Sequence, residues 1–377
     1  MKTLIKGAYA VKADCSGFEC RDLFIEDGII VESLSGEADK VISAKGKYLL
    51  PGLVDIHTHG YHGVSYYGKD DDFSDALKRN AEAGITTVVA TVGTRSEEVM
   101  LAAIENIKRQ KSRVLPGAEI GGIHLEGPFV SQGKLGVMKD TFSACSVEQF
   151  NKFCDAADGL LKVMTIAPER ENAVEVIAEG ARRGVRMSLG HTLATYEEAM
   201  AGIEAGATGA THTFNAMAPF NHREPGVLGA VLTDPRVTCE VICDMIHLAP
   251  TTVKIIAKTK GAGGMILVSD SGSISGLGDG DYMLEGSPRY VRDGVVKTES
   301  GSIAGSSYTM AHGARRLLEV GFSLADIALV GAKNPAEAIG LGGEVGTLDV
   351  GKRANVIISD ESFNVERVLV GEYDTAE

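Results

Sequence analysis

The chain has 377 residues, of which 44% are hydrophobic and 23% are charged, and its formal net charge is -14 with a pI near 5.2. This length and apolar content suffice for a large globular core, in one large domain or in one domain with a satellite. The acidic balance, without any prominent run of Lys or Arg, argues against nucleic acid or an anionic membrane as the main partner.

Residues 1–14 lack the long apolar core of a signal peptide, and no apolar run approaches membrane-spanning length. We therefore expect a cytoplasmic protein. The six cysteines are scattered without a repeating framework, which favours reduced thiols over disulfides. Cys239 and Cys243 lie in an apolar stretch and are expected to be small core residues and not metal ligands.

Both ends of the chain are predicted to form short β-strands. The apolar triplets 23–25 and 29–31 flank Asp27-Gly28, a strong hairpin signal. Near the other end, strands are expected at 346–348, 354–358 and 365–370. Two strand-rich ends around a different middle predict one small β-sandwich domain built from residues 1–48 and 344–377.

The middle, residues 49–343, alternates predicted strands with predicted helices. Eight strands, each followed by a helix or a loop, match a closed (β/α)8 barrel, whose sites lie at the carboxyl ends of the strands. A doubly wound open sheet is the alternative, but a GxGxxG turn does not follow the first strand. The strands are expected within 49–63 and at 86–91, 120–125, 162–167, 185–189, 207–211, 237–242 and 265–268, and helices at 75–83, 97–111, 174–183 and 196–205.

The first barrel strand runs directly into a pair of histidines. Because side chains alternate along a strand, His57 and His59 point to one side while Thr58 points to the other. Two neighbouring imidazoles at the carboxyl end of a strand are more typical of a shared ligand than of two separate structural roles. His62 is out of phase in a glycine-rich loop, where an ordinary hydrogen-bonded histidine is expected.

Four later strands also end in residues that can bind a metal. Glu126 ends the third strand, His191 follows the fifth, His212 the sixth and Asp270 the eighth. Each of them alone could be an ordinary core or loop residue, but six such groups at one end of a barrel predict a metal site. Imidazole with carboxylate suits zinc or iron(II) and leaves positions open for water. His124, one pleat below Glu126, is expected in the core or behind a ligand.

These strand ends carry a family resemblance. The segments HTHG, HLEGP, GHT, HTFNAM and SD together resemble the amidohydrolase superfamily. Within it, HLEGPF, THTFNAM, REPG at 223–226 and IAGSS at 303–307 resemble the N-acetylglucosamine-6-phosphate deacetylases over essentially the whole chain. The resemblance implies hydrolysis of the acetamide of N-acetyl-D-glucosamine 6-phosphate to D-glucosamine 6-phosphate and acetate. Alternatives are an N-acetylgalactosamine-6-phosphate deacetylase or another C–N hydrolase with a related anionic substrate.

The resemblance also implies roles for the metal-site residues. Glu126 would ligate or bridge the metals, in place of the carboxylated lysine that dihydroorotase-like relatives carry on the fourth strand. His191 and His212 would hold one ion, and His57 with His59 a second. Some relatives lack this first pair and use one metal. Since the pair is intact here, we expect two divalent ions, zinc or iron(II), about 3.5–4 Å apart.

Asp270 would act both as a ligand and as the acid–base group. It would take a proton from the attacking water and return it to the departing amine, which leaves poorly unless it is protonated. The alternative is an ordinary helix N-cap after the last strand, a position where Asp is also favoured.

Substrate contacts follow from the same motifs. Arg223 has the guanidinium fork that suits a phosphate, although it could be an ordinary surface arginine. The resemblance suggests a homodimer in which Arg223 reaches the site of the neighbouring subunit. His247 matches a substrate-contacting histidine of the family. Further contacts, partly through backbone groups, are expected from Asn215, Ala216, Ile303, Ala304, Gly305 and Ser306.

Two departures from the family pattern bear on the substrate. Relatives carry a histidine near the acyl oxygen in a Lys-Gly-Ala-His-like segment, whereas residues 133–138 contain none and place Met138 there. Met245 replaces the usual glycine before the histidine after strand seven. The glycine- and serine-rich loop 273–280 is expected to be an ordinary solvated loop beside the site.

Two other classes of function fit the sequence less well. A cyclic amidase or an aminohydrolase deaminase would fit the metal residues but not the REPG and FNAM segments. A non-catalytic scaffold should lack some ligands, and all six are present in this sequence.

Overall fold

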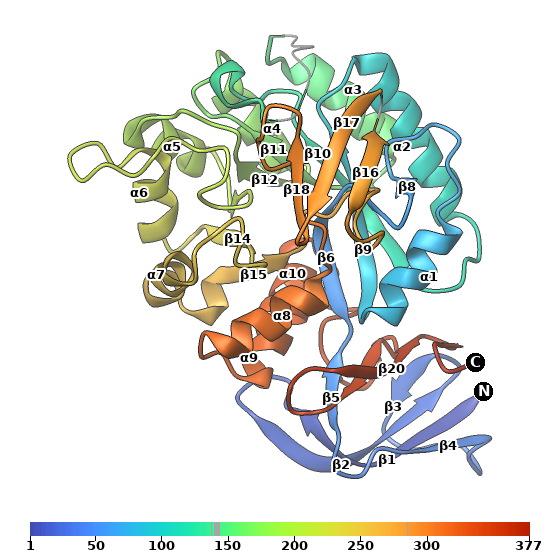
Figure 1. Ribbon diagram of the computed structural model, residues 1–377. Helices are drawn as coiled ribbons and strands as arrows, with labels where there is room; N and C mark the ends of the chain where they lie inside the picture. The colour runs from blue at the N-terminus through green and yellow to red at the C-terminus, as the bar shows by residue number, and fades with distance from the viewer. Residues whose placement is uncertain (137, 139–143, 285) are drawn as a thin grey trace.

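The computed structural model describes residues 1–136, 138, 144–284 and 286–377, and its largest part is a barrel of eight parallel strands (Figure 1). The strands follow one another around the barrel in chain order, and a parallel bridge between Thr58 and Ser271 joins the last strand to the first. The predicted (β/α)8 barrel is confirmed. Its strands are β6 (Leu53–Thr58), β9 (Ile85–Gly93), β10 (Glu119–Glu126), β11 (Leu161–Ile166), β12 (Arg186–Leu189), β13 (Gly209–Ala210), β14 (Thr238–Ile242) and β15 (Met265–Val268).

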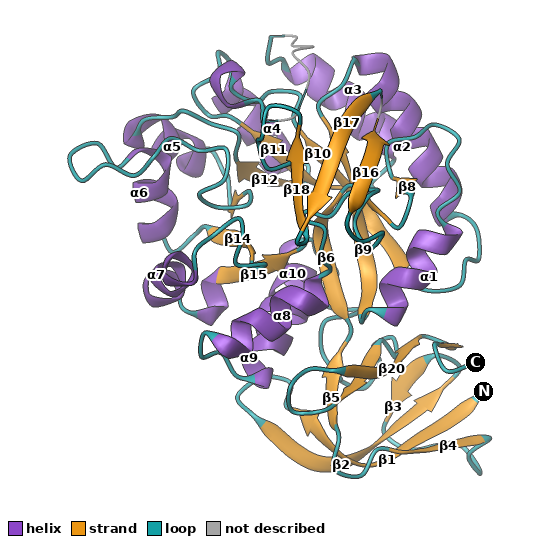
Figure 2. Cartoon of the chain, viewed as in Figure 1, coloured by secondary structure: helices purple, strands orange, loops and turns teal. Residues whose placement is uncertain are grey.

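Helices cover the outside of the barrel (Figure 2). Their starts follow the sequence locally, because Ser96 caps the second helix and Thr195 forms a capping box with Glu198 at the fifth. The helices are α1 (Ser74–Glu82), α2 (Glu97–Lys111), α3 (Val147–Ala157), α4 (Ala173–Arg182), α5 (Tyr196–Glu204), α6 (Gly226–Thr233), α7 (Pro250–Lys260), α8 (Met310–Glu319), α9 (Leu324–Ala328) and α10 (Asn334–Ala338). Short helical turns lie at η1 (Gln132–Lys134), η2 (Ala262–Gly264) and η3 (Leu329–Lys333).

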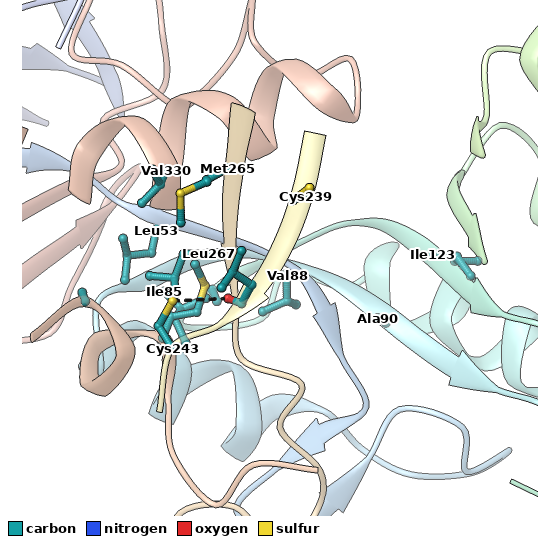
Figure 3. Packing of buried hydrophobic residues seen from close by; sticks show 14 of the residues in the cluster. Leu53, Ile85, Val88, Ala90, Ile123, Cys239, Cys243, Met265, Leu267 and Val330 are labelled. Carbon is teal, nitrogen blue, oxygen red and sulfur yellow. Dashed lines mark hydrogen bonds between the residues drawn. The ribbon is translucent and has the colours of Figure 1, made fainter. Parts of the chain in front are cut away.

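The core fills the space between the strands and the helices. Leu53, Met265, Leu267 and Val330 pack together where the first and last barrel strands meet the C-terminal helices (Figure 3). All six cysteines are free, and Cys239 and Cys243 are buried, as predicted for small core residues. The barrel strands are buried along nearly their whole length, which explains their near-continuous apolar sequences.

Strands from both termini form a separate sheet below the barrel in Figure 1, where the two chain ends lie side by side. The predicted hairpin is present, and Asp27 and Gly28 both have positive φ, as its tight turn requires. The predicted strand at 346–348 is wrong: Gly346 has φ of 92° and the segment forms bends. The sheet contains β1 (Lys2–Val11), β2 (Phe18–Glu26), β3 (Ile29–Val31), β4 (Lys40–Ser43), β5 (Tyr48–Pro51), β19 (Val356–Ser359), β20 (Val365–Val370) and β21 (Tyr373–Asp374).

Because β5 belongs to this sheet and leads directly into the first barrel strand, the chain passes from sheet to barrel at Gly52. The exact domain boundaries stay a prediction.

A small antiparallel sheet follows the last barrel strand and lies near the barrel mouth, away from the terminal sheet (Figure 1). It consists of β16 (Gly280–Leu284), β17 (Ser287–Arg292) and β18 (Val295–Thr298). The loop before this sheet is only partly the solvated loop that was predicted: Ser273 and Ser275 are buried and Ser273 lines the main cavity, whereas residues 276–279 are exposed. A two-stranded ribbon, β7 (Gly60–Tyr61) and β8 (Val64–Ser65), follows the first barrel strand.

Within the described residues, every helix is too short or too polar to span a bilayer.

Candidate metal centre

The main cavity opens at the carboxyl ends of the barrel strands and has a volume of about 620 Å³. This size is typical of sites for small molecules. Five of the six predicted metal-site residues line it, and the sixth, His57, is completely buried beside them.

The first group of candidate ligands joins three strands. Glu126 ends β10, and His191 and His212 follow β12 and β13. Glu126 Oε1 lies 3.2 Å from His191 Nε2 and 3.1 Å from His212 Nε2, and the two imidazole nitrogens are 3.0 Å apart. All three side chains are buried, so one cation could contact all three atoms while shielded from water.

The second group adjoins the first through Glu126. His59 Nε2 and His57 Nε2 lie 3.4 Å and 3.6 Å from Asp270 Oδ1. Glu126 faces this group with both oxygens, since Oε1 is 3.3 Å from His57 Nε2 and Oε2 is 3.2 Å from His59 Nε2. The two imidazoles point to the same side, as their strand phase predicts. Glu126 therefore lies between the two groups, where a bridging carboxylate would be.

The backbone at three of these positions is unusual. His191, His212 and Asp270 have φ of 46°, 25° and 48°, a region that residues with a side chain seldom adopt. Each follows the last residues of a barrel strand, so the chain turns sharply and directs the side chain into the cavity. Such strained residues cluster at functional sites in proteins.

The hydrogen bonds behind the ligands favour the form of histidine that binds metals. His191 Nδ1 lies 2.7 Å from the Lys134 carbonyl oxygen, which can only accept, so Nδ1 donates and Nε2 presents a lone pair to the site. His57 Nδ1 lies 3.1 Å from Glu240 Oε2 and donates in the same way. His57 Nε2 faces the Glu126 and Asp270 oxygens but, within the described part of the chain, makes no well-aligned hydrogen bond. These residues fit a divalent cation.

The charges of the cluster agree with this fit. Burial alone would raise the pKa of Glu126, but the neighbouring histidines hold that pKa well below its usual range. Burial also opposes ionisation of Asp270, yet His57 and His59 lower its pKa to about 2. Conversely, Glu126 and Asp270 raise the pKa of His57 well above its ordinary value, against the effect of burial. Buried carboxylates need positive charge among them, which protons or cations can supply.

Glu240 was missed by the sequence analysis. It lies on β14, fully buried, and its Oε2 accepts hydrogen bonds from His57 Nδ1 and, at 3.4 Å, from the His212 backbone N–H. Burial alone would raise the pKa of Glu240, but the hydrogen bond from His57 outweighs burial. The pKa is therefore lowered, and the carboxylate is ionised. A lone glutamate inside the apolar stretch TCEVIC was the signal that could have identified it, since a buried carboxylate needs a partner.

Other polar residues near the strand ends lie outside the cluster. His124 is fully buried and bonds the Ile56 carbonyl and Thr165 through its two ring nitrogens, so it is a core residue beneath the site. Burial lowers its pKa to about 3. Glu169, after the fourth strand, accepts bonds from Thr192 Oγ1 and the Leu193 N–H. His62 is partly exposed and adjoins Asp75, consistent with the ordinary role expected for it.

Most of the predicted substrate residues border the cavity. Asn215, Ala216 and His247 line it. His247 Nδ1 lies 2.7 Å from Asp244 Oδ2, which fixes the ring. Ser306 is buried behind the wall, where its hydroxyl donates to the same Asp244 oxygen at 3.3 Å. The other predicted wall residues are Ile303, Ala304 and Gly305.

Arg223 does not line the cavity. It lies in an exposed loop before α6, which projects from the left side of the molecule in Figure 1. Its predicted reach into a neighbouring subunit therefore stays a prediction.

Of the two positions where the resemblance implies a departure from the family pattern, Met138 lines the cavity, while the neighbouring Val137 lies outside the described residues. Met245 has φ of 63°, a conformation that a glycine adopts more readily. The cavity also has cationic walls that were not predicted, from Arg95, Lys134 and Arg289.

Comparisons with known proteins agree with this geometry. The sequence model of the amidohydrolase family matches residues 48–371. The N-acetylglucosamine-6-phosphate deacetylase of Bacillus subtilis is 37% identical over 323 residues, covering 84% of this chain and 82% of that protein. The N-acetylgalactosamine-6-phosphate deacetylase of Escherichia coli O157:H7 is 32% identical and covers 92% of this chain and 93% of that protein.

Solved structures extend the likeness to the whole fold. A mutant N-acetyl-D-glucosamine-6-phosphate deacetylase from Mycobacterium smegmatis, in complex with N-acetyl-D-glucosamine-6-phosphate, superposes with a TM-score of 0.90 at 31% identity over 99% of both chains. The Thermotoga maritima deacetylase gives a TM-score of 0.87 at 31% identity, also over 99% of both chains. The chain therefore belongs to the amidohydrolase family and, within it, to the N-acetylglucosamine-6-phosphate deacetylases.

Proposed function

We propose that the chain hydrolyses the acetamide of N-acetyl-D-glucosamine 6-phosphate to D-glucosamine 6-phosphate and acetate in amino-sugar catabolism. The observation that carries the proposal is the convergence of His57, His59, Glu126, His191, His212 and Asp270 at one cavity, whose wall carries the predicted sugar contacts. Its cytoplasmic location stays a prediction.

Membership of the amidohydrolase family implies a divalent metal. We propose that each subunit holds two such ions, zinc or iron(II). Glu126, His191 and His212 would hold one, and His57, His59 and Asp270 the other, with Glu126 between them. A divalent cation in such a site polarises the amide carbonyl and lowers the pKa of water from 15.7 towards about 7.

We propose that Asp270 moves the proton. His57 and His59 outweigh burial and keep its carboxylate ionised, and this carboxylate would accept a proton from the attacking water. The same oxygen would then donate that proton to the nitrogen of the sugar amine as the C–N bond breaks. The backbone N–H of Asp270 donates to the His57 carbonyl at 2.9 Å, which fixes the residue at the closure of the barrel.

We propose that His247 orients the acetamide. Its Nδ1 donates to Asp244 Oδ2 at 2.7 Å, and Asp244 outweighs the effect of burial and raises the pKa of the ring. A protonated imidazole can donate to the carbonyl oxygen as negative charge develops there. His247 could thereby supply the donor that relatives place at the position of Met138.

The decisive experiment is a turnover panel on metal-reconstituted protein. Acetate release would be measured with the 6-phosphates of N-acetylglucosamine and N-acetylgalactosamine and with their unphosphorylated forms, and ring opening to N-carbamoyl aspartate would be measured with dihydroorotate. Fastest release from N-acetylglucosamine 6-phosphate supports the proposal, and preference for an unphosphorylated or cyclic substrate refutes it.

N-acetylgalactosamine 6-phosphate is the second candidate substrate. The Escherichia coli enzyme named for this substrate is 32% identical to the chain, so the sugar belongs in the panel. The two sugars differ only at the C4 hydroxyl, so the ratio of kcat/KM values in the same panel decides between them.

The number of ions and the oligomeric state need their own tests. Metal analysis should find two ions per chain in the wild type and fewer in His57→Ala; one ion in both would refute the two-ion proposal.

We also propose a homodimer in which the exposed loop of Arg223 reaches the neighbouring site. Light scattering that finds a monomer at assay concentrations would refute this arrangement.

A further inference from the structure

We propose that Asp244, which follows β14, is a positioning residue that holds His247 in place, and that Ser306 acts through Asp244 and not on the substrate. The inference rests on the proposed function, because it assumes that His247 meets the acetamide. It also gives a different role to Ser306, which the family resemblance places among the substrate contacts.

Asp244 first shapes the turn that carries His247. Its Oδ1 accepts the backbone N–H groups of Ile246 and His247, each at 2.9 Å. An aspartate that bonds the backbone two residues further on builds a tight turn. Met245, which these bonds enclose, has φ of 63°. The carboxylate therefore stabilises a backbone conformation that a residue with a side chain seldom adopts.

The other oxygen of Asp244 fixes the imidazole ring. Oδ2 accepts from His247 Nδ1 at 2.7 Å, a length typical of a charge-assisted hydrogen bond. Because Nδ1 is occupied in this way, the ring meets the cavity through its other edge. The two side chains are 8% and 4% exposed, so water competes little for the bond. Asp244 thus holds both the backbone and the ring of His247.

The charges around this pair make His247 the partner that neutralises Asp244. Burial alone would raise the pKa of Asp244, but the bond from His247 lowers it. Burial also opposes protonation of His247, yet Asp244, together with the charge of Asp270, raises the pKa of the ring. The charge of Asp244 acts on His312 of α8 as well, but burial and the adjacent arginines of that helix lower the pKa of His312. Among the described residues, His247 is the only side chain that forms an ion pair with Asp244.

Ser306 joins the cavity wall to the same carboxylate. Its hydroxyl donates to Asp244 Oδ2 at 3.3 Å and accepts the Tyr308 N–H at 3.1 Å. Its backbone N–H donates to the Asp270 carbonyl at 2.9 Å. Ser306 is 3% exposed and does not line the cavity, so its hydroxyl is turned away from a bound substrate. It therefore connects the 303–305 wall with the carboxylate that orients the imidazole.

The test is a double-mutant cycle between Asp244 and His247 in the metal-loaded enzyme. His247→Asn removes the donor and should lower kcat by about 10²- to 10³-fold, the usual loss for one oxyanion donor. Asp244→Asn leaves the ring present but less well held, and should cause part of that loss, about 10- to 100-fold in kcat, with little change in KM. Because Asp244 acts through His247, the double variant should be no slower than His247→Asn alone.

Asp234→Asn is the matched control at the other end of the same strand. Asp234 precedes β14, and its Oδ1 likewise accepts the backbone N–H two residues further on, that of Arg236, at 2.9 Å. Its carboxylate pairs with Arg236 and not with a residue of the cavity. Both kcat and KM of this variant should stay at the wild-type level.

Ser306→Ala tests the second part of the proposal. It should lower kcat about 2- to 10-fold, the usual value of one hydrogen bond, and should have no further effect in the His247→Asn background. A rise in KM that is the same in both backgrounds would show that Ser306 contacts the substrate directly, and would refute its indirect role.

Three results would overturn the role of Asp244. The first is an unchanged kcat in Asp244→Asn. The second is additivity, in which the double variant is slower than His247→Asn by the full factor that Asp244→Asn causes in the wild type. The third is an equal loss in Asp244→Asn and Asp234→Asn, which would indicate a general effect of losing a buried carboxylate.

A further measurement separates this proposal from the proposed function, because it needs no turnover. Heteronuclear NMR of zinc-loaded protein labelled at histidine reports the tautomer and the pKa of His247, whose signals are identified by their loss in His247→Asn. The pKa should fall in Asp244→Asn and stay unchanged in Asp234→Asn. If the wild type releases acetate from neither sugar phosphate, this result still supports the positioning role of Asp244. An unchanged tautomer and pKa in Asp244→Asn refute it.

Discussion

The barrel mouth and the terminal sheet each bury a carboxylate to the same extent, but they surround it with different partners. Glu126 at the mouth and Asp374 in the terminal sheet are both 4% exposed. Glu126 faces the Nε2 atoms of four histidines. Asp374 receives hydrogen bonds from the guanidinium of Arg367 and, at 2.5 Å, from the ammonium of Lys40.

The partners decide what each carboxylate can do. Arginine and lysine keep their charge at all ordinary pH values, so Asp374 is neutralised permanently by groups that are themselves attached to the fold. Imidazoles can be neutral and then present lone pairs, so Glu126 and its histidines can share a cation from solution. The first arrangement stabilises the fold, and the second creates a site for chemistry.

Removing the central carboxylate of the mouth should have the largest effect. Glu126 adjoins both groups of candidate ligands, so Glu126→Gln should lower the content of both ions. We expect kcat/KM to fall by at least about 10³-fold, a loss at least comparable to the rate contribution of a single acid–base group. Metal analysis and acetate release on the same sample measure this. A variant that keeps two ions and full turnover would show that Glu126 does not join the two groups.

Asp270→Asn should separate proton transfer from metal binding. We expect kcat to fall by about 10²- to 10⁴-fold because an amide cannot carry the proton, while the Glu126 group keeps its ion. Steady-state kinetics with metal analysis test this, and circular dichroism shows whether the fold is intact. Near-full turnover with both ions bound would exclude Asp270 as the acid–base group.

Glu240 offers a finer test of the mouth, because it contacts the site only through other residues. Its carboxylate holds His57 with Nε2 towards the cluster. Glu240→Gln can no longer secure that tautomer, so the affinity for one of the two ions should fall by about 10- to 100-fold, the usual effect of such a partner. Chelator titrations measure the loss.

Glu169→Gln is the matched control, since Glu169 bonds a neighbouring loop and no candidate ligand. It should keep both ions at wild-type affinity. If the two variants lose metal equally, the effect of Glu240 is a general one on the barrel and not the orientation of His57.

The sequence predicts the barrel well because its strands are buried on both faces. Their apolar runs stand out, and β15 and α2 have the predicted bounds. The candidate ligands were predictable because the carboxyl ends of all the strands of a barrel meet at one mouth. Glu240 was not, because its pairing with His57 spans 183 positions in the chain and follows only from closure of the barrel.

The small sheet at the mouth shows a different limit. Asp293-Gly294 has positive φ at both residues, the same turn signal that correctly predicted the hairpin at Asp27-Gly28. Short half-exposed strands lack the apolar run that makes barrel strands conspicuous. Which side of such a sheet faces the cavity depends on tertiary packing, so the placement of Arg289 could not be predicted.

The smallest effect is expected in the terminal sheet, and it concerns stability and not chemistry. Burial would raise the pKa of Asp374, but the bonds from Arg367 and Lys40 lower it to about 2. The ionised form is therefore favoured in the folded state relative to the unfolded chain. This contribution is fully present above about pH 4 and is lost as the pH falls through about 2.

Asp374→Asn should accordingly reduce the free energy of unfolding by about 1–2 kcal/mol at neutral pH. This value allows for solvent screening of the ion pairs, because Lys40 and Arg367 are partly exposed. Urea unfolding of metal-free wild type and variant measures the difference, which should shrink between pH 4 and pH 2. Metal content and turnover at neutral pH should match the wild type, because Asp374 lies in the sheet remote from the mouth. A variant that loses an ion would show that the two buried carboxylates are coupled, and the contrast between a stabilising and a chemical carboxylate would fail.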